Sequence, residues 1–152
     1  MLLEQASELV SLEEFDEAFH IYNKILRDDP KNINALIDKG VTLQRVGKNI
    51  QSIKCFDKAL KIKPKNIDGL IGKGSALHAL GKFSNAIACY NTALEIDSEF
   101  PVALAYKGLS LGEQGKIKDA LKYFKMALAI DKEYDLAQIS KKKALELLKS
   151  KK

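Results

Sequence analysis

The chain has 152 residues, of which 46% are hydrophobic and 30% are charged, and its formal net charge is +5. This composition is typical of a soluble globular protein and excludes an intrinsically disordered chain. In the segment 135–152, six lysines oppose two acidic residues, so +4 of the net charge lies there. A basic stripe along the whole molecule, the expected footprint of a nucleic-acid-binding protein, is therefore absent.

The chain contains only three prolines and no linker rich in glycine or serine. We therefore expect a single domain over residues 1–152. The first ten residues lack both the basic flank and the long apolar run of a signal peptide or a membrane span. We expect no membrane association and a cytoplasmic location.

A pattern of small and aromatic residues returns every 34 positions without insertion or deletion. Gly40, Gly47, Phe56 and Ala59 recur as Gly74, Gly81, Tyr90 and Ala93, and again as Gly108, Gly115, Phe124 and Ala127. A fixed period of this length is typical of proteins built from stacked repeats.

The first unit, residues 1–32, follows the same period with two departures. Ala6 stands where the later units have a helix-crossing glycine, and Glu13 stands where they have a turn glycine. Ser11 and Glu14 have the spacing of a capping box, in which each side chain bonds to the backbone of the other residue. We expect this box to begin the second helix of the unit.

The second unit, residues 33–66, contains two apolar stripes of helical spacing, at 36–46 and 50–62. Gly47 lies between them and predicts a left-handed residue that ends the first helix. Pro64 and Asn66 predict the end of the second helix and the start of the next. The units 67–100 and 101–134 repeat this pattern, so each unit is predicted to be an antiparallel helix pair.

Small residues mark the predicted crossing of the two helices in each pair. Gly40, Ser52 and Ala59 let the backbones approach, and Phe56 fills the space beside them. A glycine within a helix costs about 1 kcal/mol relative to alanine. Its return in three units indicates that close packing outweighs this cost.

Residues 135–149 predict one more helix without a partner. Leu136, Ile139 and Ala144 are apolar, whereas Lys141 and Lys142 are expected to face solvent. Repeat arrays need such a terminal helix to cover their last core. We therefore expect a capping helix.

The repeated set of small, small, aromatic and small residues resembles the tetratricopeptide repeat (TPR) family, whose unit has about 34 residues. The resemblance implies an all-α fold, an α–α superhelix (solenoid) of four antiparallel helix pairs and a final capping helix. Leu36, Leu70 and Leu104 depart from the family's favoured tryptophan. Lysine replaces the usual leucine at Lys39, Lys73 and Lys107.

The resemblance also implies a concave groove that is lined by the first helices and binds peptides or partner proteins. The family's groove-facing positions carried over to this sequence are Asn34, Ile37, Val41, Gln44, Arg45, Asp68, Ile71, Ser75, His78, Ala79, Val102, Ala105, Leu109, Gly112 and Glu113. Ile139 and Lys143 extend this surface onto the capping helix. The alternative is that its aliphatic row packs between adjacent first helices.

One TPR subclass grips acidic chaperone C-termini with a clamp of Lys, Asn and Arg side chains. Here the fifth position of each unit holds Leu3, Ile37, Ile71 or Ala105, and Arg45 alone cannot form such a clamp. The groove is instead expected to offer an apolar stripe to a helix or an extended peptide.

The residues with reactive side chains do not form a catalytic pattern. His20 and His78 have no metal-ligand spacing with a cysteine or carboxylate. Cys55 and Cys89 stand at the same position of neighbouring repeats, which lie roughly 10 Å apart, too far for a disulfide. We therefore expect no cofactor, no metal and no enzymatic activity.

The sequence thus predicts a non-enzymatic scaffold that binds a protein or peptide in a partly apolar groove. One alternative is a self-associating array, in which apolar Leu2 and Leu3 stack on another chain as a homo-oligomer. A weaker alternative is an adaptor that contacts nucleic acid through the lysine-rich C-terminus, and we regard nucleic acid as an unfavoured partner.

Overall fold

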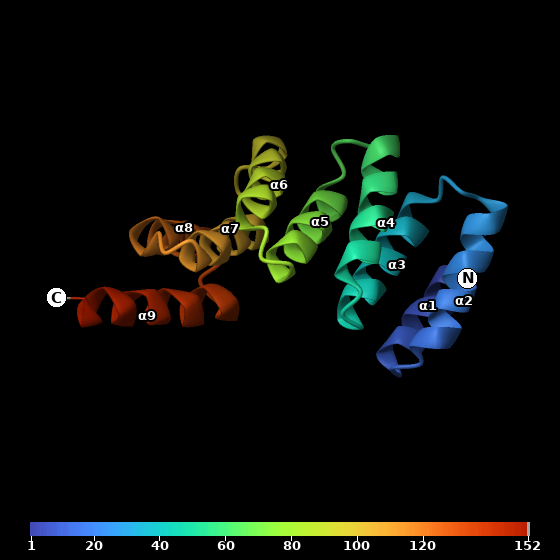
Figure 1. The fold of residues 1–152 in the computed structure, drawn as a ribbon, viewed down its shortest axis with the longest axis horizontal. Helices are drawn as coiled ribbons and strands as arrows, with labels where there is room; N and C mark the ends of the chain where they lie inside the picture. Colours follow the sequence, from blue (N-terminus) through green and yellow to red (C-terminus); the bar gives the residue numbers. More distant parts are fainter. Residues whose placement is uncertain (152) are drawn as a thin grey trace. The chain divides into compact units, whose positions relative to one another are not determined.

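The computed structural model describes residues 1–151, and this part of the chain is all helical, as predicted (Figure 1). Short turns join its nine helices. Their bounds are α1 Leu2–Ser11, α2 Phe15–Asp28, α3 Ile33–Arg45, α4 Asn49–Ile62, α5 Ile67–Ala79, α6 Phe83–Ile96, α7 Pro101–Glu113, α8 Ile117–Ile130 and α9 Asp135–Ser150.

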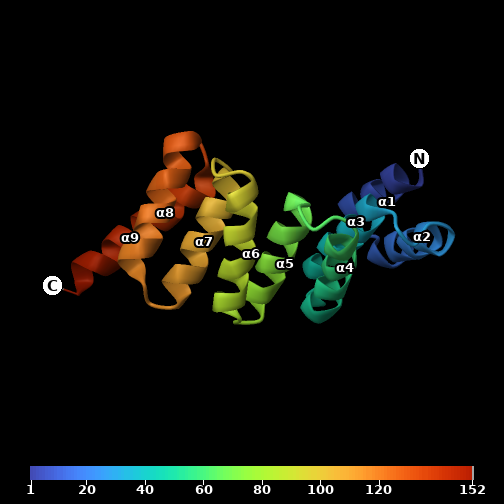
Figure 2. The ribbon, with the colours of Figure 1, turned by 90° about the horizontal axis from the view of Figure 1, so that it is seen from above.

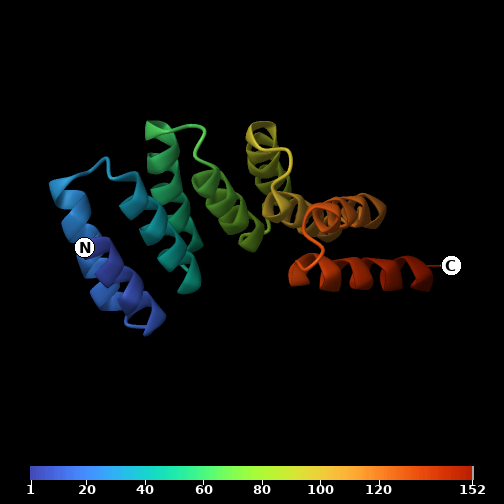
Figure 3. The same ribbon diagram turned by 180° about the vertical axis from the view of Figure 1, so that it is seen from behind.

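The chain divides into two compact units, Met1–Ala76 and Leu77–Lys152. In the first unit, α1 packs on α2 and α3 packs on α4, while α3 also contacts α2 and α1 (Figures 1 and 3). In the second unit, α7 packs on α6 and α8, and α9 packs on α8 and α7 (Figure 2). The predicted capping helix is therefore present and covers the last helix pair.

The predicted glycine turns close the helix pairs. Gly47, Gly81 and Gly115 have φ angles of 80°, 76° and 79°, in the left-handed region where glycine is favoured. The next amide donates back to a carbonyl five residues earlier, as in Lys48 N to Leu43 O at 2.8 Å. This is the Schellman arrangement, and it satisfies carbonyls at the end of the first helix.

The turn between α1 and α2 uses the same arrangement, and the capping box predicted there is wrong. Glu13 adopts φ 61°, and the amide of Glu14 donates to Leu9 O at 2.9 Å. The Ser11 hydroxyl donates to Ser7 O within α1, and no side chain caps the start of α2. A left-handed Glu13 makes the Schellman turn without glycine, so Ser11 is still within α1 and cannot cap α2.

Asparagine begins two of the first helices. Asn32 Oδ1 accepts from the amide of Ala35 at 2.9 Å, and Asn66 Oδ1 accepts from the amide of Gly69 at 2.8 Å. These bonds satisfy amides that have no partner within the helix. The predicted start at Asn66 is therefore confirmed.

The aromatic residue of α4 lies between the backbones of two first helices. A Cβ atom added to Gly40 in α3 would lie 2.8 Å from Phe56 Cε1, and one added to Gly72 in α5 would lie 2.4 Å from Phe56 Cζ. The Phe56 side chain is fully buried. The sequence predicts the contact of Phe56 with Gly40. It does not predict the contact of Phe56 with Gly72, which lies on the first helix of the next pair.

Candidate partner-binding site

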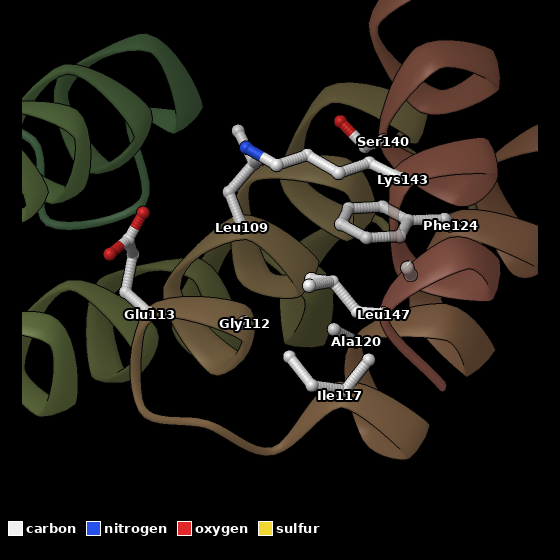
Figure 4. A pocket seen from close by; sticks show the side chains of 10 residues that line it. Leu109, Gly112, Glu113, Ile117, Ala120, Phe124, Ser140, Lys143 and Leu147 are labelled. Atoms are coloured by element: carbon white, nitrogen blue, oxygen red, sulfur yellow. The ribbon is translucent and has the colours of Figure 1, made fainter. Parts of the chain in front are cut away.

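A cavity of about 260 Å³ lies between three helices of the second unit (Figure 4). We call it the α7–α9 pocket. Its lining comes from the C-terminal half of α7, the first half of α8 and the middle of α9. These residues are Leu109, Gly112, Glu113, Ile117, Ala120, Phe124, Ser140, Lys143, Ala144 and Leu147.

The apolar part of the pocket belongs to the core of the last helix pair. Phe124, Ala120 and Ala144 are buried in one cluster, against which Leu109 and Ile117 pack. Figure 4 shows the Phe124 ring in the middle of the lining, with Leu147 and Ile117 on one side of it. A leucine or aromatic side chain entering here would therefore meet hydrocarbon.

Gly112 leaves the pocket open. A Cβ atom at this position would meet only Ala120 Cβ, at 3.9 Å. Gly108, one turn earlier, differs because its Cβ would lie 2.5 Å from Phe124 Cε1. The missing side chain at Gly112 thus creates space, whereas the missing side chain at Gly108 permits close packing.

Two opposite charges stand at the pocket. Glu113 on α7 and Lys143 on α9 are both exposed, and Leu147, also on α9, is 41% exposed. Figure 4 shows the Lys143 chain extending toward Leu109. The pocket therefore combines an apolar interior with one acidic and one basic group that a ligand can reach.

The sequence-predicted groove residues of the second unit have different environments. Leu109 lines the pocket and Val102 is half-buried, whereas Ala105 is fully buried in the core between α7, α8 and α9. His78 Nδ1 lies 2.8 Å from Ser110 Oγ, and its ring meets Phe83 edge-on at 5.1 Å. His78 therefore holds neighbouring helices together within this unit.

In the first unit, the predicted residues on α3 also divide into exposed and packed positions. Asn34 is exposed, Val41 is 44% exposed and Gln44 is half-buried, but Ile37 is buried against Phe56 and Ala59. Arg45 donates from Nη1 to Val10 O at 3.4 Å and stacks over the Phe15 ring at 5.5 Å. Arg45 thus contacts the preceding helix pair.

The predicted residues at the start and middle of α5 remain accessible. Asp68 is exposed, and Ile71 and Ser75 are half-buried. None of them lines the α7–α9 pocket.

Sequence reasoning missed part of the pocket. It placed Leu109, Gly112, Glu113 and Lys143 on the expected binding surface. It did not place Leu147 there, which stands one helical turn beyond Lys143 on α9. Continuing the repeat numbering into the capping helix would have identified Leu147. Ile117 had no sequence signal, because it lies at the start of a second helix.

The residues with reactive side chains are in structural environments. Burial raises the pKa of the Cys55 thiol, which disfavours the thiolate needed for nucleophilic attack. Burial also raises the pKa of the Tyr134 hydroxyl to about 12. Within residues 1–151, no cluster of three or more His, Cys, Asp or Glu side chains could hold a metal ion. The same residues include no helix with the length and hydrophobicity needed to cross a membrane.

The helix pairs and the 34-residue period define a helical-repeat protein, and the apolar pocket lies between α7, α8 and α9. The family profile described as "Tetratricopeptide repeat" matches residues 33–66, and the one described as "TPR repeat" matches residues 74–115. Together they cover half of the chain. The chain therefore belongs to the tetratricopeptide repeat family.

Several solved structures have the same fold. The MamA protein shares 21% identity over 95% of this chain and 79% of its own, with a TM-score of 0.82. The first TPR of Spaghetti (RPAP3), bound to the HSP90 peptide SRMEEVD, shares 23% over 79% of this chain and 95% of its own, with a TM-score of 0.73.

YrrB, described as a TPR protein with an unusual peptide-binding site, shares 22% identity over 97% of this chain and 76% of its own, with a TM-score of 0.75. At these identities, the similarity of the three structures shows the fold alone. A comparison with curated proteins finds no match.

Proposed function

We propose that the chain is a non-enzymatic interaction scaffold that binds a partner polypeptide, and that the α7–α9 pocket anchors one apolar side chain of that partner. The observation that carries this proposal is the open apolar cavity beside Gly112. Two proteins of the same fold support it, because their structures are described as peptide-bound or as having a peptide-binding site.

The gain in affinity from one anchored side chain can be estimated from its burial in the pocket. Full burial of a leucine- or phenylalanine-sized side chain is worth about 1.5–3 kcal/mol. Each 1.4 kcal/mol is a factor of ten in affinity, so one anchor raises affinity by about ten- to a hundredfold. The exposed Glu113 and Lys143 would add about 0.2–1 kcal/mol each for oppositely charged partner groups.

The predicted groove set also has exposed members in the first unit, apart from the α7–α9 pocket. Asn34, Val41, Arg45 and Asp68 are exposed, and Ile71 and Ser75 are half-buried. Ile37 and Ala105 drop out of the proposed contact surface, because both are buried.

The test fills the pocket without burying a charge. In Gly112→Leu, the new Cβ atom would meet only Ala120 Cβ, at 3.9 Å, and the rest of the side chain would enter the pocket. Leucine is also a good helix former. Gly112→Ala is the matched control, because it changes the backbone preference equally but leaves most of the cavity open. Each immobilised variant is used to capture proteins from a cell extract, and the captured proteins are quantified by mass spectrometry.

We expect the wild-type chain and Gly112→Ala to enrich the same polypeptide and Gly112→Leu to lose it by tenfold or more. Equal capture by all three chains would contradict the proposed site. Thermal unfolding of each variant checks that the fold is retained.

A second candidate function is self-association through the N-terminal helix pair. Two exposed leucines favour this function. Leu2 on α1 is 39% exposed, and Leu12, just beyond α1, is 62% exposed. Light scattering over a range of concentrations separates the two functions. A monomer at high concentration counts against self-association and leaves the partner-binding proposal standing.

A further inference from the structure

The last helix, α9, has a face on which no second helix packs. In α3, the corresponding face carries Leu36, Gly40 and Leu43, all buried, and α3 packs there on α4. Three repeats later, these positions hold Gln138, Lys142 and Leu145. Leu145 is 37% exposed, and both Gln138 and Lys142 are exposed.

A shallow surface depression of about 460 Å³ lies between this face and the end of α8. We call it the α8–α9 face. Its residues are Leu128, Lys132, Gln138, Lys141, Lys142 and Leu145. The face thus has two leucines, three lysines and one amide, and it contains no acidic side chain.

Lys141 differs from two lysines at the same repeat position in the first unit. Lys39 Nζ donates to Asn23 Oδ1 at 2.7 Å, and Lys73 Nζ lies 2.7 Å from Asp57 Oδ1. In both pairs the partner precedes the lysine by 16 residues, on the previous second helix. For Lys141, the residue at this spacing is Lys125, a second cation.

The α8–α9 face and the α7–α9 pocket use different sides of α9. Ala137, Ser140 and Ala144 form the buried side of α9. Lys143 and Leu147 line the α7–α9 pocket, whereas Lys141, Lys142 and Leu145 line the α8–α9 face. By helical periodicity, these two sets lie on either side of the buried side.

We propose that the α8–α9 face docks an acidic amphipathic helix of a partner protein. The corresponding face of α3 packs on a helix, α4, so an α-helix is the element that suits this face. Leu128 and Leu145 would contact the apolar stripe of the incoming helix, and Lys132, Lys141 and Lys142 would pair with its carboxylates. Lys142 stands at the repeat position of the helix-crossing glycine Gly40. Because its side chain keeps the two backbones apart, the partner helix would contact α9 through side chains only.

An acidic helix agrees with this face better than a nucleic acid does. The two leucines offer no hydrogen bonds to bases or phosphates, and no aromatic residue is present on which a base could stack. Helix-in-groove recognition, by contrast, uses an apolar stripe flanked by charges.

The test uses a designed, fluorescein-labelled peptide of about five helical turns, with leucines along one stripe and glutamates on both flanks. Its control is the same peptide with glutamine in place of every glutamate. Fluorescence anisotropy follows the titration of each peptide with the full chain. The protein variants are Lys141→Ala with Lys142→Ala, and Leu145→Gln.

The matched control variant is Lys54→Ala with Lys58→Ala, which removes two exposed lysines from α4. Gly112→Leu is a second control, because it alters only the α7–α9 pocket. Thermal unfolding verifies the fold of every variant.

We expect the acidic peptide to bind the wild-type chain and the two controls alike. Binding should weaken by three- to tenfold in the Lys141/Lys142 double variant and at least threefold in Leu145→Gln. The glutamine peptide should bind at least tenfold more weakly than the acidic one. A peptide with lysines in place of the glutamates should bind a Lys141→Glu, Lys142→Glu chain better than it binds the wild type.

The proposal is overturned if the acidic peptide does not bind the wild-type chain, or if the glutamine peptide binds equally well. It is also overturned if the α4 control loses as much affinity as the Lys141/Lys142 variant. Binding of an oligothymidine that depends on these lysines, but not on Leu145, would identify the face as a nucleic-acid contact instead.

Discussion

The contact of Phe56 with two helix backbones makes a quantitative prediction for Gly72→Ala. The added Cβ would lie 2.4 Å from Phe56 Cζ and 2.5 Å from Cε1, whereas carbon atoms in contact lie about 3.5–4.0 Å apart. Gly40 on α3 also packs closely on this ring, since a Cβ atom there would lie 2.8 Å from Cε1 and 2.9 Å from Cζ. The buried ring therefore has little room to move. One methyl group therefore forces α4 and α5 to shift.

Overpacking of this kind costs about 1–3 kcal/mol, and sometimes more. Alanine in place of a helical glycine returns up to about 1 kcal/mol. Since the Phe56 ring is fully buried and packs on both Gly40 and Gly72, we expect the upper part of the overpacking range and a net loss of about 1–2 kcal/mol. At about 2–4 °C per kcal/mol for a chain of this size, the unfolding midpoint should fall by several degrees.

The assay is urea and thermal unfolding followed by circular dichroism, with Gly112→Ala as the control. Gly112 has open space at its Cβ position, so this variant should be as stable as the wild type or more stable by up to about 1 kcal/mol. A double variant, Gly72→Ala with Phe56→Leu, should lose less than the sum of the single losses, because the smaller side chain removes the clash. If Gly72→Ala and Gly112→Ala had the same effect, the close approach of α5 to Phe56 would be refuted.

Three further predictions concern single groups. Glu13→Gly should stabilise the chain by about 0.5–1 kcal/mol in urea unfolding, because Glu13 holds a left-handed conformation at φ 61°; a loss of stability would contradict this. Burial and then the Asp68 carboxylate raise the pKa of Asp38, so the folded state keeps this proton to higher pH than the unfolded state, and stability is lost as pH rises through that window. Asp38→Asn should therefore raise the unfolding midpoint at pH 7, with a gain that shrinks as the pH falls and is lost below the ordinary carboxyl pKa of 3.8. An equal gain at pH 7 and at about pH 3 would exclude this cause. The buried Cys55 thiol should react with a thiol reagent far more slowly in the folded chain than in urea, and equal rates would show that it is accessible.

The helix pairs could be predicted from the sequence because their signals are local and repeated. Helical spacing of apolar residues marks each helix, and Gly47, Gly81 and Gly115 mark the turns. The first turn was predicted wrongly, because Ser11 and Glu14 have the spacing of a capping box. The actual turn depends on Glu13, whose left-handed conformation no residue-type preference indicates.

The binding surface was less predictable because exposure depends on the neighbouring helix. Repeat position alone does not distinguish Ile37, which is buried, from Ile139, which occupies the same position in the capping helix and is 67% exposed. The difference arises because α9 ends the described array and has no further first helix packed beside it. Similarly, the repeat position of Gly112 predicts that it faces the groove, but only the packing of α8 and α9 shows that it lines a pocket.

Amide chemical-shift mapping tests the partner-binding site most directly. The isotope-labelled chain is titrated with the polypeptide that it captures, and the shifts are assigned to residues. The account predicts that the largest shifts fall at Leu109, Glu113, Lys143 and Leu147, and that Gly112→Leu removes them. Binding that leaves these four residues unshifted in the wild-type chain would contradict the account.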